Sequence, residues 1–252
     1  MSIDRNRRAV LFDLDGMLLP VEMNFFLKHY MDAIAAAFAP MMEPPAFKKA
    51  LMEATFDTIR NTDPSVGNLD AFAAAFTRRS GMPWESTWPV IQRYYLEEYP
   101  LLRKHVLDLP GEEARVREHC STVRLVLRQC IDNGWDIVLA TQPIFPETAV
   151  RERMRWCGIE DFPWRFISNL DNMHFCKPHL EYYREVLDCA GLEPARCVMV
   201  GNDMQEDMVA KRVGTKTFLV EDYLIDRGED LAPDGRGRLA DVPEAIERLL
   251  PA

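Results

Sequence analysis

Residues 9–20 read AVLFDLDGMLLP, an apolar run that is broken by two aspartates one residue apart and then by a glycine. The short run from Ala9 to Phe12 predicts a buried β-strand. Side chains two positions apart point to the same side of an extended chain, so Asp13 and Asp15 could face one site. Two carboxylates this close repel each other, so the pair indicates either an ordinary turn or a site that binds a positive charge.

The composition limits the classes of protein that this chain can belong to. With 252 residues, 48% of them hydrophobic, it can bury the core of one large domain or of two smaller ones. Its net charge of -10 argues against a surface for nucleic acid or anionic lipid. Charged residues in the first eight positions and the lack of a long apolar stretch favour a protein without a signal peptide or membrane span. The six cysteines form no CxxC pair, which predicts reduced thiols in a cytoplasmic protein.

Further β-rich runs follow in the second half of the chain, and helical patterns separate them. Apolar positions in steps of three and four predict a helix over residues 116–130, and further helices are expected over about 146–157, after Pro178, and over about 205–213. Alternation of strand and helix predicts an α/β fold with a doubly wound, Rossmann-like parallel sheet. The other expected strands cover residues 135–140, 165–167, 197–200 and 217–220.

The interval from residue 21 to residue 109 has a different character. It contains no clear β-run, it is punctuated by prolines, and its apolar spacing predicts helices over residues 25–38, 45–59 and 69–79. We therefore predict a helical domain over residues 21–109, inserted into a sheet domain made of residues 1–20 and 110–252. The hinges would lie near Leu19-Pro20 and Leu109-Pro110-Gly111.

Polar residues follow several of the predicted strands or precede their helices. Thr141 follows the second strand, Lys177 precedes a helix, and Asp203 and Asp207 follow the strand that ends near residue 200. Each of these alone is most often a turn, a solvated charge or a helix cap. Because the carboxyl ends of parallel strands form one crevice, we expect them to converge.

Asp13, Asp15 and Asp203 would then form a site of hard oxygen ligands. Mg²⁺ prefers such ligands, and it binds through few carboxylates while keeping waters and substrate phosphate oxygens. A cation would also offset the repulsion between Asp13 and Asp15. Lys177 and Thr141 could hold the remaining phosphate oxygens.

The ordered set of these motifs resembles the four signatures of the haloacid dehalogenase superfamily. The matching stretches are Asp13-Leu14-Asp15-Gly16, Thr141, Lys177-Pro178 and residues 201–207, which read GNDMQED. The helical interval after the first motif is similar to the helical cap of that family. The resemblance spans nearly the whole chain, and it implies an α/β core with an inserted cap and hydrolase activity.

The resemblance also implies a role for each residue. Asp13 would be the nucleophile that forms an aspartyl-phosphate, and Asp15 the general acid and then the base. Mg²⁺ would bind the carboxylates of Asp13 and Asp203 and the backbone carbonyl of Asp15. The remaining assignments are Thr141, Gln142 and Lys177 for the phosphoryl group, and Asn202 and Asp207 for support around the metal.

Position 17 departs from the family pattern, because it is Met where most phosphatases of this type carry Thr. We expect this change to affect local packing more than activity. Two further patterns, His174-Phe175-Cys176 with His179 and the aromatic residues between 84 and 99, are interpreted as loop and packing residues.

The expected function is that of a Mg²⁺-dependent phosphatase acting on a small phosphorylated metabolite. The dehalogenases that name the superfamily lack the second aspartate of the first motif, so Asp15 argues against carbon–halogen cleavage. A phosphonate-cleaving relative would need a cap lysine, and nothing singles out Lys28, Lys48 or Lys49. A sugar phosphomutase and a non-catalytic phosphate sensor remain as alternatives. The sequence does not indicate the substrate or the oligomeric state.

Overall fold

The computed structural model describes residues 7–228 and 231–250, and their centre is a six-stranded parallel sheet. The strand order is β3-β2-β1-β4-β5-β6, which is that of a Rossmann-like, doubly wound sheet and confirms the predicted α/β class. The strands are β1 (Ala9–Phe12), β2 (Asp136–Leu139), β3 (Trp164–Ile167), β4 (Cys197–Gly201), β5 (Lys216–Val220) and β6 (Gly235–Gly237).

The strand that carries the opening motif lies where the strand order reverses. Phe12, the last residue of β1, pairs with Leu139 of β2 on one side and with Val200 of β4 on the other. In open α/β sheets, ligands bind beyond the carboxyl ends of the strands at this switch point. The residues that follow β1, β2 and β4 are therefore brought to the same place.

Helices cover both faces of the sheet, which explains why the strands read as nearly continuous apolar runs. Val10 and Phe12 face a core shared with α6, α7 and α9, whereas Ala9 and Leu11 face α8 and the 3-10 helix η4. The elements are α6 (Glu113–Asp132), α7 (Glu147–Cys157), α8 (Leu180–Ala190), η4 (Met208–Val213) and α9 (Val242–Leu249).

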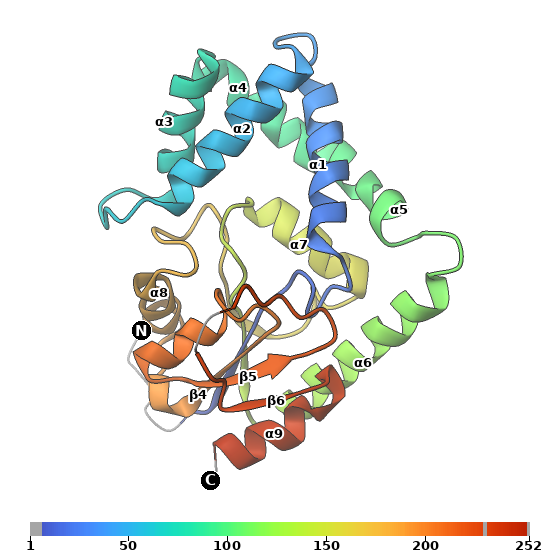
Figure 1. Ribbon diagram of the computed structural model, residues 1–252, viewed down its shortest axis with the longest axis vertical. Coiled ribbons are helices and arrows are strands. Elements are labelled where there is room, and N and C mark those ends of the chain that lie inside the picture. Colours follow the sequence, from blue (N-terminus) through green and yellow to red (C-terminus); the bar gives the residue numbers. More distant parts are fainter. Residues whose placement is uncertain (1–6, 229–230, 251–252) are drawn as a thin grey trace.

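Residues 21–109 contain no strand, in agreement with the sequence. Their helices gather at one end of the molecule, with the sheet at the other end (Figure 1). Whether they form a separately moving domain remains a prediction. The helices are α1 (Met23–Phe38), α2 (Pro44–Ile59), α3 (Asn68–Ser80), α4 (Trp84–Arg93), a π-helical turn η1 (Tyr94–Glu98), a 3-10 turn η2 (Tyr99–Leu102) and α5 (Arg103–Val106).

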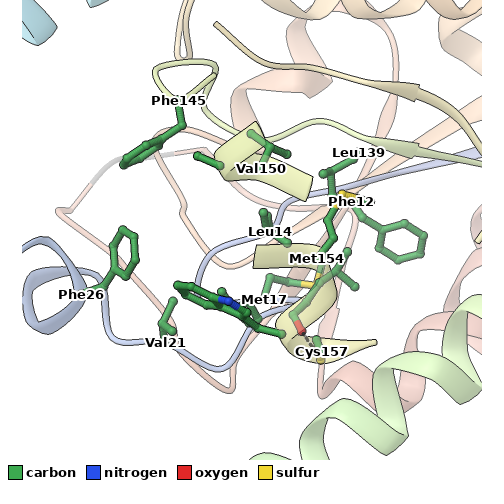
Figure 2. Packing of buried hydrophobic residues seen from close by; sticks show 14 of the residues in the cluster. Phe12, Leu14, Met17, Val21, Phe26, Leu139, Phe145, Val150, Met154 and Cys157 are labelled. Atoms are coloured by element: carbon green, nitrogen blue, oxygen red, sulfur yellow. Dashed lines mark hydrogen bonds between the residues drawn. The ribbon is translucent and has the colours of Figure 1, made fainter. Parts of the chain in front are cut away.

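Met17 lies in the core beneath the first loop. Its side chain is fully buried and lies in the same packed cluster as Leu14, Val21 and Met154 (Figure 2). The apolar residue at this position therefore fills the space between the loop and α7.

The structure corrects the prediction that every cysteine is a reduced thiol. Cys120 of α6 and Cys157 at the end of α7 form a disulfide, with their Cα atoms 5.1 Å apart. The two residues are 37 positions apart in the chain and become neighbours only through the packing of α6 on α7, so their spacing gave no signal.

Candidate active site

All of the predicted site residues except Lys177 line one cavity of about 110 Å³. Six of them come from three different strand ends, which lie up to about 190 residues apart in the sequence but adjacent in the sheet. Met23, Glu206, Ile225 and Arg227 also line the cavity and were not predicted. The predicted residues that line it are Asp13, Asp15, Thr141, Gln142, Asn202, Asp203 and Asp207.

Lys177 lies beside this cavity and is 1% exposed. Its Nζ donates hydrogen bonds to Oδ1 of Asp13 at 2.8 Å and to Oδ1 of Asp207 at 2.6 Å. Burial alone would lower the pKa of Lys177, but the carboxylates of Asp13 and Asp207 outweigh it and raise the pKa well above its ordinary value. The site therefore contains a permanent positive charge in contact with the predicted nucleophile.

Gly201, the last residue of β4, makes room for this arrangement. A Cβ atom at this position would overlap the carboxylate of Asp207. Oδ2 of the same carboxylate accepts a hydrogen bond from the backbone N–H of Asp203 at 3.1 Å. Asp207 thus fixes both Lys177 and the backbone of the Asp203 loop.

Asp203 is held by its own loop and by an arginine. Its Oδ1 accepts hydrogen bonds from the backbone N–H groups of Gln205 at 2.9 Å and Glu206 at 3.0 Å. Arg227 donates to both carboxylate oxygens of Asp203, each at 2.9 Å. The carboxylate therefore faces a positive partner in the cavity.

Thr141 and Gln142 follow β2, and Gln142 has a role that the sequence did not indicate. Its side-chain amide accepts from the backbone N–H of Lys177 at 2.9 Å and donates to the carbonyl of the same residue at 3.1 Å. The Gln142 side chain therefore clamps the Lys177 loop. Thr141 is 1% exposed, and its carbonyl accepts a 2.7 Å hydrogen bond from the hydroxyl of Tyr182.

Two residues hold the loops around the cavity together. The side-chain amide of Asn202 donates to the carbonyl of Tyr223 at 2.7 Å. Gly16 has φ of +80°, and a Cβ atom there would lie 2.8 Å from Nδ2 of Asn202. A glycine is thus required both by the left-handed backbone and by the close approach of Asn202.

Asp15 lies deeper than Asp13 and contacts an arginine that the sequence analysis missed. Nε of Arg153, on α7, lies 3.3 Å from Oδ1 of Asp15. Burial raises the pKa of Asp15 to about 6, and the guanidinium of Arg153 opposes this rise. A carboxyl group with such a pKa can carry a proton near neutral pH and release it.

Two of the site residues that were not predicted, Arg153 and Arg227, could have been found from the sequence. Arg153 occupies a position on the otherwise apolar face of its helix, beside Val150 and Met154. Arg227 follows the strand that ends at Val220, and the residues after that strand were not included in the predicted site. Glu206 lies within the motif over residues 201–207, and burial raises its pKa to about 7.

The donor set fits a hard divalent cation. The carboxylates of Asp13 and Asp203 and the backbone carbonyl of Asp15 are all oxygen donors, and Mg²⁺ completes such a set with water and substrate oxygens. In the described part of the chain, no group of three or more His, Cys, Asp or Glu side chains could hold a metal by itself. A cation at Asp203 would compete with Arg227 for the same two oxygens.

A family model for haloacid dehalogenase-like hydrolases matches residues 7–214, which include every one of the predicted site residues. The chain belongs to this family. No curated protein matches the sequence at a significant level. Within residues 7–228 and 231–250, none of the helices is long and apolar enough to cross a membrane.

Solved structures of both phosphatases and dehalogenases share this fold. A 2-haloacid dehalogenase from Pseudomonas syringae pv. tomato DC3000 matches with a TM-score of 0.61 and 17% identity, over 96% of this chain and 99% of that one. CbbY from Rhodobacter sphaeroides, solved in complex with phosphate, matches with a TM-score of 0.56 and 17% identity, over 94% and 96%. A HAD phosphatase from Thermococcus onnurineus matches with a TM-score of 0.53 and 19% identity, over 95% and 97%. These likenesses show the fold and do not choose between the two reactions.

Proposed function

We propose that this hydrolase is a Mg²⁺-dependent phosphatase that acts on a small phosphorylated metabolite through an aspartyl-phosphate on Asp13. The observation that carries the proposal is that Asp13 and Asp15 line one cavity while Lys177 bonds to Asp13. A second acidic group beside the nucleophile serves a reaction whose leaving group needs a proton. Halide needs none.

Asp13 would attack phosphorus through a carboxylate oxygen, forming a bond to phosphorus as the bond to the leaving oxygen breaks. Lys177, which is held by Asp207, would neutralise charge on the equatorial oxygens, and the Thr141 hydroxyl would donate to one of them. Asp207 and Gln142 keep Lys177 in place, because they bind its ammonium and its backbone.

Asp15 would give its proton to the leaving oxygen in the first step. In the second step, it would take a proton from the water that attacks phosphorus, which releases phosphate and restores Asp13. The rise in the pKa of Asp15 to about 6, caused by burial, supports both roles. Mg²⁺ at Asp13, Asp203 and the Asp15 carbonyl would supply charge neutralisation for the phosphoryl oxygens.

The cavity supports a small phosphorylated substrate. Its volume of about 110 Å³ suits a phosphoryl group, and Met23 at the start of α1 lines its wall together with Ile225. The leaving group would extend toward Met23 and so toward residues 21–109, which we propose act as a cap that closes over the substrate.

The test is the hydrolysis of 4-nitrophenyl phosphate and of a panel of phosphorylated metabolites, with and without Mg²⁺. We expect activity that excess chelator abolishes and that Ca²⁺ restores poorly, because Ca²⁺ prefers more ligands and looser geometry. Full activity in excess chelator would contradict the metal assignment. Accumulation of a bisphosphorylated sugar during turnover would support the phosphomutase alternative, and no turnover in any condition would support a phosphate sensor.

A further inference from the structure

Arg153 is a buried arginine on α7 that the proposed reaction does not use directly. Its side chain is 0% exposed, and Asp15 is the only carboxylate in ion-pair contact with it in the described part of the chain. A buried charge costs several kcal/mol unless it is well paired and hydrogen-bonded. An apolar residue would fill this position on the buried face of the helix more cheaply, so the arginine calls for an explanation.

The contacts of Arg153 contribute little to the stability of the fold, because they leave several of its donors without an acceptor in the described part of the chain. Its Nε and Nη2 have no hydrogen-bond acceptor within the described residues, although Nε lies 3.3 Å from Oδ1 of Asp15. Nη1 donates to the hydroxyl of Tyr99 at 3.2 Å, and the guanidinium lies 4.3 Å from the ring centre of Phe145. Buried donors without acceptors are costly. This arrangement therefore favours a role at the site over a role in stability alone.

The ion pair determines which oxygen of Asp15 faces the cavity. Oδ1 is buried, and no hydrogen-bond donor reaches it within the described residues. The Asp15 side chain nevertheless keeps 9% of its surface exposed and lines the cavity. The exposed oxygen is therefore Oδ2, while Oδ1 points to Arg153.

Arg153 also contacts two residues of the helical segment 21–109. Besides the hydrogen bond to Tyr99 of η2, its guanidinium lies 5.7 Å from the ring centre of Phe26 of α1. Figure 2 shows Phe26 and Phe145 on the same side of α7, beside its end that carries Val150, and their ring centres lie 6.1 Å apart. Arg153 thus lies between Asp15 and the segment that we propose moves as a cap.

We propose that Arg153 is a positioning residue that holds Asp15 with Oδ2 toward the cavity, and that Tyr99 and Phe26 link this arrangement to the helical segment. The inference rests on the proposed function, since it assigns Arg153 to the orientation of the proton donor. The guanidinium itself does not touch the substrate.

The experiment compares Arg153→Met and Arg153→Lys in single turnovers with enzyme in excess. Phenyl phosphate needs a proton on its leaving oxygen, whereas 4-nitrophenyl phosphate does not. General acid catalysis contributes typically 10²–10⁴-fold, so Arg153→Met should lower the phenyl-to-nitrophenyl rate ratio by at least about tenfold. Arg153→Lys should keep the ratio within about threefold of the wild type, because the positive charge remains.

Two further variants separate positioning from folding. Arg151→Met removes an arginine from the exposed side of the same helix, where it pairs with Glu147 at 2.7 Å, and should leave the ratio unchanged. Tyr99→Phe removes the hydrogen bond to Arg153 alone and should lower the ratio in the same direction by a smaller factor. This variant and Arg153→Lys serve as the test if Arg153→Met fails to fold.

Crystal structures of the wild type and of the Arg153 variants give a readout that does not depend on turnover. We expect the Asp15 carboxylate to rotate in Arg153→Met and to keep its orientation in Arg153→Lys. Equal losses on both substrates with Asp15 unmoved would overturn the inference. If the wild type hydrolyses neither substrate, the proposed phosphatase function fails, and an unmoved Asp15 in the variant would reject the positioning role as well.

Discussion

Lys177 donates a 2.8 Å hydrogen bond to Asp13, which lies 164 residues before it in the chain. The same ammonium bonds to Asp207, so one buried cation lies in contact with two carboxylates from two different loops. Removing one partner of a buried ion pair strongly destabilises the folded protein, because the other charge remains buried without compensation. Lys177 is therefore needed both for the proposed chemistry and for the fold around it.

We expect Lys177→Met to abolish phosphatase activity and to lower the free energy of unfolding by about 3–5 kcal/mol. The reason is that Asp13 and Asp207 would face each other without a cation. Urea unfolding and the 4-nitrophenyl phosphate assay measure the two effects. Arg248→Met, at an exposed ion pair with Glu244, is the control and should cost at most about 1 kcal/mol. Equal stability of the two variants would contradict the structural role of Lys177.

Gly201→Ala tests the support around Lys177 without removing a charge. The added Cβ would overlap the Asp207 carboxylate, which must then shift away from Lys177 and from the Asp203 backbone. Overpacking of this kind costs typically about 1–3 kcal/mol. We expect the variant to remain folded with this modest loss in the free energy of unfolding, and to lose most of its phosphatase activity.

The control for this change is Gly67→Ala. Gly67 has an extended backbone with φ of -64°, and the nearest atom to an added Cβ is 3.9 Å away. Thermal unfolding and Mg²⁺-dependent turnover should be close to those of the wild type in this control. If Gly201→Ala behaved the same way, the tight contact between Gly201 and Asp207 would be wrong.

The lowered pKa of His119 should make the free energy of unfolding depend on pH. Its Nε2 donates to the carbonyl of Met17 at 2.9 Å, and burial lowers the pKa of its ring below the ordinary value. The Met17 carbonyl and the Asp222 carboxylate partly oppose this fall, and Arg115 adds to it. Because the unfolded chain takes up the proton more readily, stability contributed by neutral His119 is lost as the pH falls through about 6.5.

The measurement is the free energy of unfolding of the wild type and of His119→Gln at pH 7.5 and at pH 5.5. Glutamine can still donate to the Met17 carbonyl but does not titrate. We expect the wild type to lose more stability than the variant between these two pH values. Identical losses would show that the pKa of His119 is the same in the folded and the unfolded chain, which would contradict the lowered pKa of the buried ring.

The sequence was sufficient to predict those features that depend on residues close together in the chain. Apolar runs predicted β1 to β5, and the residues after those strands, together with the family resemblance, predicted seven of the eleven residues that line the cavity. It failed at β6, Gly235–Gly237, because two glycines in three residues carry no strand preference and pair only since β5 lies alongside. The helix expected over residues 205–213 is instead a 3-10 helix, Met208–Val213, after the turns that hold Asp203.

The remaining misses depend on contacts between distant segments. Arg153 meets Asp15 only because α7 packs under the first loop, and Arg227 meets Asp203 only because the segment after β5 returns to β4. The disulfide between Cys120 and Cys157 has the same origin. Spacing within the sequence does not encode such pairs, whereas strand order brings the main motifs together in any chain of this fold.

The proposed roles of Asp13 and Asp15 predict that their asparagine variants fail differently. Asp13→Asn removes the nucleophile and a metal ligand, so no phospho-enzyme should form and Mg²⁺ affinity should fall. Asp15→Asn keeps the backbone carbonyl, so Mg²⁺ affinity should be largely retained, although Arg153 loses its carboxylate. What it loses is the acid and base, typically worth ~10²–10⁴ in rate.

4-Nitrophenyl phosphate distinguishes the two variants, because its leaving group needs no proton. Asp15→Asn should release one nitrophenolate per site in a burst and then turn over slowly, since the phospho-enzyme lacks the base that activates water. Asp13→Asn should show no burst. Calorimetric titration with Mg²⁺ gives the affinities, and thermal unfolding establishes that both variants are folded. The same kinetics and the same Mg²⁺ affinity in both would refute the division of labour between the two aspartates.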